Sequence, residues 1–132
     1  LGTTTARDYA SVFTRLVRGQ LISERADRQM VEILKKQHYN SMITKDFPPV
    51  YMDSDNTDDI LIQVASKSGS MDACRNDGGI VYTPYGPYVL VMLNKGFSDA
   101  MYYPAHPATV FGARVSRMLL DQFLALEGRF VL

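Results

Sequence analysis

The residues best suited to chemistry are Lys67, Ser68 and Gly69, which follow directly on the apolar-rich run 60–66. A β-strand that delivers a cation, a hydroxyl group and a residue without a side chain can press its backbone against an anionic, carbonyl-containing ligand. These residues can bind such a ligand but not attack it, and no serine in the chain is followed three positions later by a lysine. The sequence therefore predicts the binding half of an active site.

Composition limits the classes of protein to which the chain can belong. Of its 132 residues, 46% are hydrophobic, which is typical of one domain that buries a core. The 14 Lys and Arg residues balance the 14 Asp and Glu residues, so a nucleic acid is not an expected partner. The longest apolar run, 88–93, is far shorter than the ~20 residues that span a bilayer, so we expect no membrane span. A single cysteine, Cys74, excludes an internal disulfide and every metal site built from several cysteines.

The first half of the chain is predicted to form two helices. Threonines at positions 3–5 can cap a helix whose apolar residues recur at helical spacing, and Gly19 would end it. Ser23 can cap a second helix that runs to about residue 37, with an acidic residue early and two lysines late. Residues 39–59 lose this periodicity and contain two prolines and a polar cluster, which indicates a long connection.

The second half is predicted to form strands and one more helix. Strands are expected at 60–66, 79–83 and 88–93, the last two joined by a turn that contains Pro and Gly, which indicates an antiparallel meander. Because 88–93 is apolar at every position, it is expected to be a central strand, covered on both faces and paired on both edges. Pro107 would open a long amphipathic helix that ends near Glu127. Its expected apolar stripe comprises Phe111, Val115, Met118, Leu119 and Leu126.

The order of elements predicts an α+β fold in a single domain, 1–132. It would have two N-terminal helices, a three-stranded antiparallel meander and a long C-terminal helix packed on the sheet.

Four features occur in an order that resembles a known family. They are the threonine-rich helix start 2–8, the Lys-Ser-Gly strand, the tripeptide Arg75-Asn76-Asp77 and the terminal amphipathic helix. Together they resemble the C-terminal part of class A β-lactamases and related penicillin-recognising serine hydrolases, over nearly the whole chain. The resemblance implies a partial β-lactamase/transpeptidase-like fold without a cofactor. It also implies a parent protein outside the cytoplasmic membrane, secreted, periplasmic or on the cell surface, that cleaves a β-lactam or, as a second choice, a cell-wall peptide by acylating a serine.

The family distributes its active site over a Ser-x-x-Lys nucleophile, a Ser-Asp-Asn loop and, in class A, an acidic residue just before the threonine-rich helix. All of these would lie upstream of Leu1, so we expect a C-terminal fragment that has no catalytic residue and is inactive when isolated. A literal Ser54-Asp55-Asn56 occurs in the chain, but only ten residues separate it from Lys67. Since most of a domain separates the two motifs in the family, we interpret this match as a coincidence.

The resemblance implies a substrate-binding role for each of five residues, and four of these roles have a plainer alternative. Lys67 would stabilise the substrate carboxylate, or it is a solvated lysine at a strand end. Ser68 would hydrogen-bond that carboxylate, or it is an ordinary edge hydroxyl. Gly69 would allow close backbone approach, or it is a turn residue. The main-chain N–H of Ser70 would be one of two oxyanion donors, and Arg75 would be a second cation for the carboxylate or a surface arginine.

The remaining residues with reactive side chains are interpreted as structural. Cys74 lies beside a cation that could activate its thiol, but neither histidine is placed to serve it as a base, so we favour a buried, structural cysteine. His38 suits a helix C-terminus and His106 a helix start. Two distant histidines predict no metal site.

Two other hypotheses stay open at this point. The chain could be a non-catalytic binding or assembly module that keeps the fold without the chemistry, or a self-contained α+β domain with a fortuitous Lys-Ser-Gly. In the resembling fold, 88–93 pairs with a strand from the N-terminal part. We therefore expect the isolated chain to self-associate through that edge or through exposed helix faces.

Overall fold

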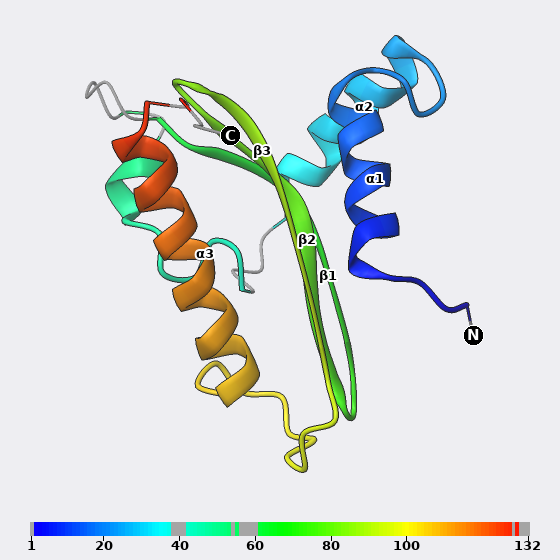
Figure 1. Cartoon of the computed structure of the whole chain (residues 1–132), viewed down its shortest axis with the longest axis vertical. Coiled ribbons are helices and arrows are strands. Elements are labelled where there is room, and N and C mark those ends of the chain that lie inside the picture. The colour runs from blue at the N-terminus through cyan, green and yellow to red at the C-terminus, as the bar shows by residue number, and fades with distance from the viewer. Residues whose placement is uncertain (1, 38–41, 54, 56–60, 128, 130–132) are drawn as a thin grey trace.

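A computed structural model describes residues 2–37, 42–53, 55, 61–127 and 129, and Figure 1 shows how its elements are arranged. The α+β order predicted from the sequence is confirmed, with one short helix added. In chain order the elements are α1 (Ala6–Val17), α2 (Glu24–Lys35), the 3-10 helix η1 (Pro49–Met52), β1 (Gln63–Met71), β2 (Cys74–Thr83), β3 (Gly86–Lys95) and α3 (Pro107–Ala125).

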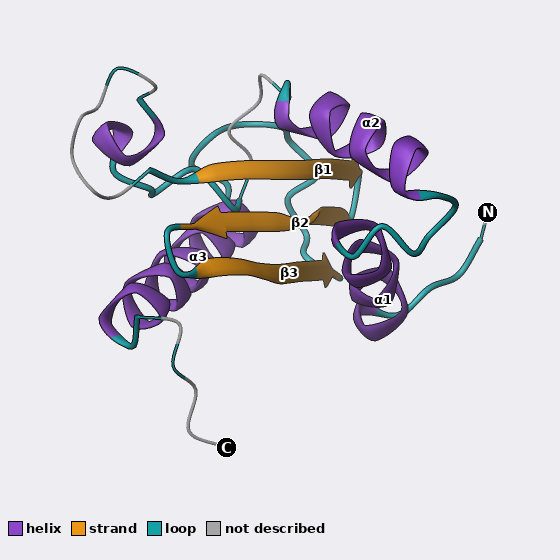
Figure 2. Cartoon of the chain, turned by 90° about the horizontal axis from the view of Figure 1, so that it is seen from above, coloured by secondary structure: helices purple, strands orange, loops and turns teal. Residues whose placement is uncertain are grey.

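The three strands form one antiparallel sheet in the order β1-β2-β3, covered by helices on both faces. Figures 1 and 2 show α1 and α2 against one face and α3 against the other. On the shared face, α2 packs mainly on β1 and α1 mainly on β3. The expected meander and the packing of the C-terminal helix on the sheet are therefore confirmed.

Each face of the sheet has its own apolar core, because successive strand residues point to opposite sides. Ile80 and Val81, neighbours in β2, are both fully buried but belong to different cores. The core under α1 and α2 comprises Phe13, Leu16, Val31, Ala65 and Ile80. The core under α3 comprises Ile43, Phe47, Ile62, Val64, Val81 and Leu120.

The helices begin where the sequence predicts caps. The hydroxyl of Thr5 accepts a hydrogen bond from the Asp8 N–H at 3.1 Å, and that of Ser23 accepts one from the Ala26 N–H at 3.2 Å. Gly19 follows α1 with φ of +66°, a conformation that costs glycine least.

The predicted long connection contributes more to the fold than its lack of periodicity indicates. Within it, Met42, Ile43 and Phe47 are buried. The carboxylate of Asp77, itself 2% exposed, accepts hydrogen bonds from the main-chain N–H groups of Met42 and Ile43 at 3.1 and 3.0 Å. This buried carboxylate ties the connection to β2, which gives Asp77 a structural role.

The predicted apolar stripe of α3 is wrong. Phe111 is 65% exposed and Met118 is 71% exposed, whereas Gly112 and Ser116, on another side of the helix, contact the connection. The buried residues of α3 are Gly112, Ala113, Ser116, Leu120 and Phe123. The helix has two apolar sides, and the side with glycine, alanine and serine packs because it lets the helix backbone come close to the connection.

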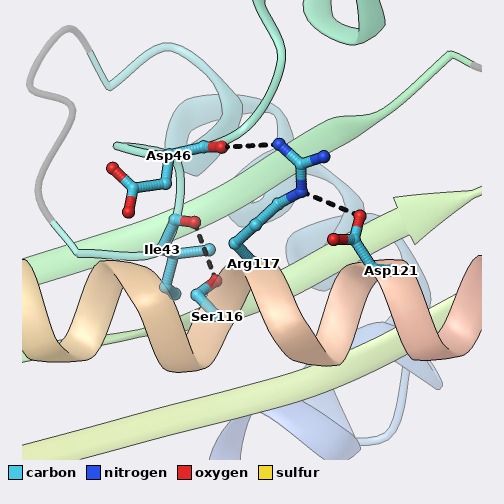
Figure 3. A network of polar contacts seen from close by, with 5 residues as sticks. All are labelled: Ile43, Asp46, Ser116, Arg117 and Asp121. Carbon is cyan, nitrogen blue, oxygen red and sulfur yellow. Dashed lines mark hydrogen bonds and ion pairs between the residues drawn. The ribbon is translucent and has the colours of Figure 1, made fainter.

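Polar contacts between α3 and the connection follow from this close approach (Figure 3). The buried hydroxyl of Ser116 donates to the Ile43 carbonyl at 2.8 Å. On the next residue, the Arg117 guanidinium donates to the Asp46 carbonyl at 3.1 Å and pairs with Asp121 at 2.8 Å. The buried hydrogen bond satisfies a carbonyl that water cannot reach, so it contributes more than the exposed ion pair.

Two strand predictions need correction. Residue 60 lies outside the described residues, and β1 extends to Met71, so the Lys-Ser-Gly residues lie inside the strand rather than at its end. In the described part of the chain, β3 pairs with β2 alone, which makes β2 the central strand. An apolar run indicates that both faces of a strand are covered, but it does not indicate whether another strand pairs with each edge.

Candidate substrate-binding site

The expected binding residues lie along β1, which forms one edge of the described sheet. Their side chains alternate between the two faces. Lys67 lies on the face of α1 and α2, where it lines an apolar cleft, and Ser70 lies on the α3 face with its register partner Arg75. Ser68 is two residues from Ser70 and therefore shares its face. The edge thus presents a cation on one side and two hydroxyl groups on the other.

Lys67 is exposed, and its ammonium donates to the Ser68 carbonyl. In the described part of the chain it forms no ion pair with a carboxylate. The cleft beside it has a volume of about 280 Å³. Its other lining residues are Tyr9, Val12, Phe13, Leu16, Leu21, Met30, Ile33 and Leu34. The ammonium is therefore accessible from solvent and is not neutralised by a carboxylate of the described residues, so it can bind an anion.

Gly69 is a strand residue paired with Asn76, so the alternative reading as a turn residue is wrong. A Cβ atom built on Gly69 would meet no atom within 4 Å. The space next to its backbone is therefore open to a ligand. The neighbouring Ser70 is also exposed, whereas Ser68 is half-buried.

Arg75 is neither a surface residue nor a free cation. It is 4% exposed, and its guanidinium lies 4.2 Å from the Tyr102 ring and 5.2 Å from the Phe97 ring. Four main-chain carbonyl groups accept its hydrogen bonds. They are Met71 O at 2.5 Å, Cys74 O at 2.8 Å, Ala100 O at 2.9 Å and Met101 O at 2.8 Å. Because its donors are engaged within the chain, the geometry favours a structural role for Arg75 over the expected contact with the substrate carboxylate.

The loop before α3 is ordered by a second set of polar contacts. His106 is 1% exposed, its Nε2 lies 2.9 Å from the Asp99 carbonyl, and its Nδ1 accepts from the Ala108 N–H at 3.2 Å. The Tyr103 hydroxyl donates to the Asp99 carboxylate at 2.7 Å, and this hydrogen bond is the main cause that lowers the pKa of Asp99. His106 therefore caps α3, and the structural role predicted for it is confirmed.

The other residues with reactive side chains can be compared with their predicted roles as follows. Cys74 is half-buried at the start of β2, not fully buried as predicted. His38, Ser54 and Asn56 lie outside the described residues. No three metal-ligating side chains come together in the part of the chain that the structure describes.

The model of one protein family, the Beta-lactamase enzyme family, matches residues 1–123. The chain belongs to this family. No curated protein matches the chain significantly.

Solved structures share the fold of this β-lactamase family chain. A β-lactamase from Sphaerobacter thermophilus DSM 20745 is 24% identical, with a TM-score of 0.70 over 89% of this chain and 40% of that protein. A structure of PBP-A is 21% identical, with a TM-score of 0.68 over 93% of this chain and 41% of that protein. A mutant of PBP-A, described as an acyl-enzyme complex with penicillin-G, matches equally well. The chain thus spans about two fifths of the length of these structures, and the partial β-lactamase-like fold predicted from the sequence is confirmed.

Sequence reasoning missed the surroundings of Ser70 in this family member. Tyr102 and Met71 are 62% and 57% exposed, and both line a cavity that includes Ser70. The only sequence signal was the pair of adjacent tyrosines at 102–103, and no periodic pattern linked them to β1. None of the helices in the described ranges is long and apolar enough to cross a membrane.

Proposed function

We propose that this chain is the substrate-binding part of a β-lactamase-like serine hydrolase. The complete protein would open the amide of a β-lactam through an acyl-enzyme. The observation that carries the proposal is the open edge of β1, where Lys67 and Gly69 are exposed on either side of the half-buried Ser68, within the region matched by the family. No serine of this chain precedes a lysine by three positions, so the nucleophile is expected elsewhere in the complete protein.

Each residue of the edge would have a distinct task. The Lys67 ammonium would attract the ligand carboxylate and raise the positive potential around the nucleophile. The Ser68 hydroxyl would donate a hydrogen bond to that carboxylate, and the open space at Gly69 would let the ligand lie against the strand. The Ser70 N–H would donate to the oxygen on which negative charge develops, and loss of one such donor typically costs ~10²–10³ in rate.

Acylation of the natural full-length protein tests the proposal. Incubation with benzylpenicillin should yield a covalent adduct with the mass of the intact drug, detected by mass spectrometry. Lys67→Ala should slow formation of this adduct by about 100-fold while changing the free energy of unfolding by less than about 0.5 kcal/mol, because an exposed lysine contributes little to packing. Lys95→Ala, at another exposed lysine of the same sheet, is the matched control. If Lys67→Ala were acylated at the wild-type rate, Lys67 would not be part of the binding site.

The competing roles predict different results in the same assay. A non-catalytic binding or assembly module would form no adduct and would leave the drug unhydrolysed, whereas a hydrolase that deacylates quickly would open the drug. A hydrolase of cell-wall peptides would be acylated by penicillin but would release the drug slowly and would cleave a D-alanyl-D-alanine peptide. The isolated 132-residue chain should turn over no chromogenic cephalosporin, because half an oxyanion hole without a nucleophile stabilises little.

Two further expectations stay predictions. Self-association of the isolated chain through the free edge of β3 would be detected by light scattering, and a monodisperse monomer would contradict it. The family also supports a place outside the cytoplasmic membrane for the complete protein, which cell fractionation would test.

A further inference from the structure

The main-chain groups of Ser70 point towards the open edge of β1. Opposite residues of an antiparallel pair either exchange their main-chain hydrogen bonds or direct both groups away from each other, in alternation. Ser70 lies opposite Arg75, whose carbonyl accepts a hydrogen bond from the side-chain amide of Asn94 in β3 at 3.0 Å. The main-chain groups of Arg75 are therefore directed towards β3, and those of Ser70 towards the edge. Ser68 has the same place in this alternation, and its carbonyl accepts from the exposed Lys67 ammonium.

Ser70 lies at a place where a strand frays unless other groups hold it. It is exposed and is the last residue but one of β1, with only residues 72–73 between this strand and β2. Exposed strand ends with few buried contacts open locally. In the proposed function the Ser70 N–H meets a developing charge, and a misplacement of about 1 Å at such a site can cost about 100-fold in rate. The end of β1 therefore needs a constraint from another part of the chain.

Arg75 provides such a constraint from β2. Four main-chain carbonyl groups accept the hydrogen bonds of its guanidinium, two beside the turn and two in the loop before α3, namely those of Met71, Cys74, Ala100 and Met101. We call these contacts the Arg75 clamp. The Met71 carbonyl lies two peptide bonds beyond the Ser70 N–H, so the clamp holds the chain directly after the proposed donor. Within the turn itself, the Ala73 carbonyl accepts from the Gly96 N–H at 3.0 Å. The turn is thus tied to groups that lie outside it.

The guanidinium can hold the turn because it is itself fixed. Arg75 is 4% exposed, and the rings of Tyr102 and Phe97 lie 4.2 and 5.2 Å from its guanidinium. The loop that supplies two of its acceptors is anchored by the buried His106, whose Nε2 lies 2.9 Å from the Asp99 carbonyl. Charged donors bound to carbonyl groups in a buried site form strong, directional hydrogen bonds. The clamp therefore links the end of β1 to the loop that precedes α3.

We propose that Arg75 is a positioning residue for acylation: its guanidinium holds the turn after β1 so that the Ser70 N–H points at the carbonyl oxygen that becomes negatively charged. The proposal rests on the proposed function, because it takes the task of Ser70 from it. It departs from the role that the family resemblance implies, in which Arg75 itself binds the ligand carboxylate. Arg75 acts through Ser70 and touches neither the carboxylate nor the reacting atoms.

Acylation kinetics of the natural full-length protein test this role. Quenched-flow mass spectrometry with benzylpenicillin measures the rate constant of acylation at saturation and the concentration that gives half of this rate. A donor that acts mainly in the transition state affects the first quantity and not the second. Arg75→Met should lower the saturating rate constant by roughly 30-fold, less than the ~10²–10³ lost when a donor is removed, and should leave the half-saturating concentration within about twofold.

The methyl ester of benzylpenicillin separates positioning from binding, because it lacks the carboxylate. Arg75→Met should lower the rate constants of the acid and of the ester by the same factor, whereas Lys67→Ala should slow the acid more than the ester. Ser116→Ala is the control for a loss of stability, since it removes a buried hydrogen bond to the Ile43 carbonyl. It should leave both rate constants at their wild-type values.

All rate constants are compared in buffer in which circular dichroism shows each variant to be folded. Arg75→Lys keeps the test decisive should Arg75→Met not fold. A lysine keeps the charge but lacks the planar fork that reaches the turn and the loop together, so it should lower the saturating rate constant by roughly fivefold.

Two results would overturn the positioning role while leaving the proposed function intact. One is a wild-type saturating rate constant in folded Arg75→Met or, in its place, in Arg75→Lys. The other is a loss of rate confined to the acid, which would mean that Arg75 binds the carboxylate. Failure of the wild-type protein to form any adduct or to open the drug would overturn the proposed function and the positioning role with it.

Discussion

Replacement of Gly79 by alanine is expected to disturb the sheet beneath the candidate site more than any exposed substitution. Gly79 lies in β2 opposite Ser66, the residue before Lys67. A Cβ atom at Gly79 would lie 2.5 Å from the Ala65 carbonyl oxygen, 2.8 Å from Ser66 Cβ and 2.9 Å from Ser66 Cα. Two of these atoms are backbone atoms, so no rotamer change can relieve the clash.

The size of the effect follows from the displacement required. Ordinary contact begins at 3.4 Å, so β1 would have to move away by up to about 0.9 Å. A shift of this size would stretch a 2.9 Å ladder hydrogen bond beyond its useful range. Loss of two or three such bonds at about 1 kcal/mol each, together with reduced packing, predicts a decrease in the free energy of unfolding of about 2–4 kcal/mol.

Urea denaturation of the natural full-length protein, followed by far-UV circular dichroism, measures this loss, and amide hydrogen exchange shows whether β1 is the region that loosens. Gly69→Ala is the matched control, because its Cβ would meet nothing within 4 Å and should change stability by less than about 0.5 kcal/mol. A difference between the two variants below about 1 kcal/mol would refute the close approach of β1 and β2.

Three further predictions follow from buried or ordered polar groups. Arg75→Met should cost about 3 kcal/mol, because four carbonyl groups lose a charged donor; a loss under about 1 kcal/mol in the urea titration would argue against the clamp. Ser116→Ala should cost about 1–2 kcal/mol, since the Ile43 carbonyl is left without its partner, and a neutral result in that titration would show that the hydrogen bond adds nothing. Tyr103→Phe should raise the pKa of Asp99 towards the usual aspartate range, because the phenol stabilises the charged form. The stability that this carboxylate contributes should be present at neutral pH and lost as the pH falls from about 4 through the lowered pKa, and an Asp99 carboxyl titration by NMR that Tyr103→Phe leaves unchanged would contradict this assignment.

Local chemistry made much of the fold predictable. The caps at Thr5 and Ser23, and the hairpin between β2 and β3, depend on residues within a few positions of one another, so their signals are complete in a short stretch of sequence. The strand that carries Lys67 was predicted for the same reason, although its end was placed too early. Local patterns define the existence of an element better than its limits.

The predictions that failed concern contacts between residues that are far apart in the sequence. The stripe of Phe111 and Met118 has the spacing of a buried helix face, but the side with Gly112 and Ser116 is buried instead, against the connection. Hydrophobicity alone favours the larger side chains, whereas the close approach of the connection requires small ones. Arg75 was expected to lie at the surface or to bind the ligand. The residues near it in the sequence do not indicate that carbonyl groups of a distant loop accept its hydrogen bonds.

The sequence by itself determined the α+β order of elements, the two capped helices and the existence of the strand that carries Lys67, because each depends on residue type and short spacing. Only the tertiary structure decided which side of α3 is buried, that the Arg75 guanidinium is engaged within the protein, and that Tyr102 lies beside Ser70. The physical reason is that burial and hydrogen-bond satisfaction are properties of groups brought together from distant parts of the chain. The pattern within one segment indicates which interactions a residue can form, and the tertiary structure determines which of them it does form.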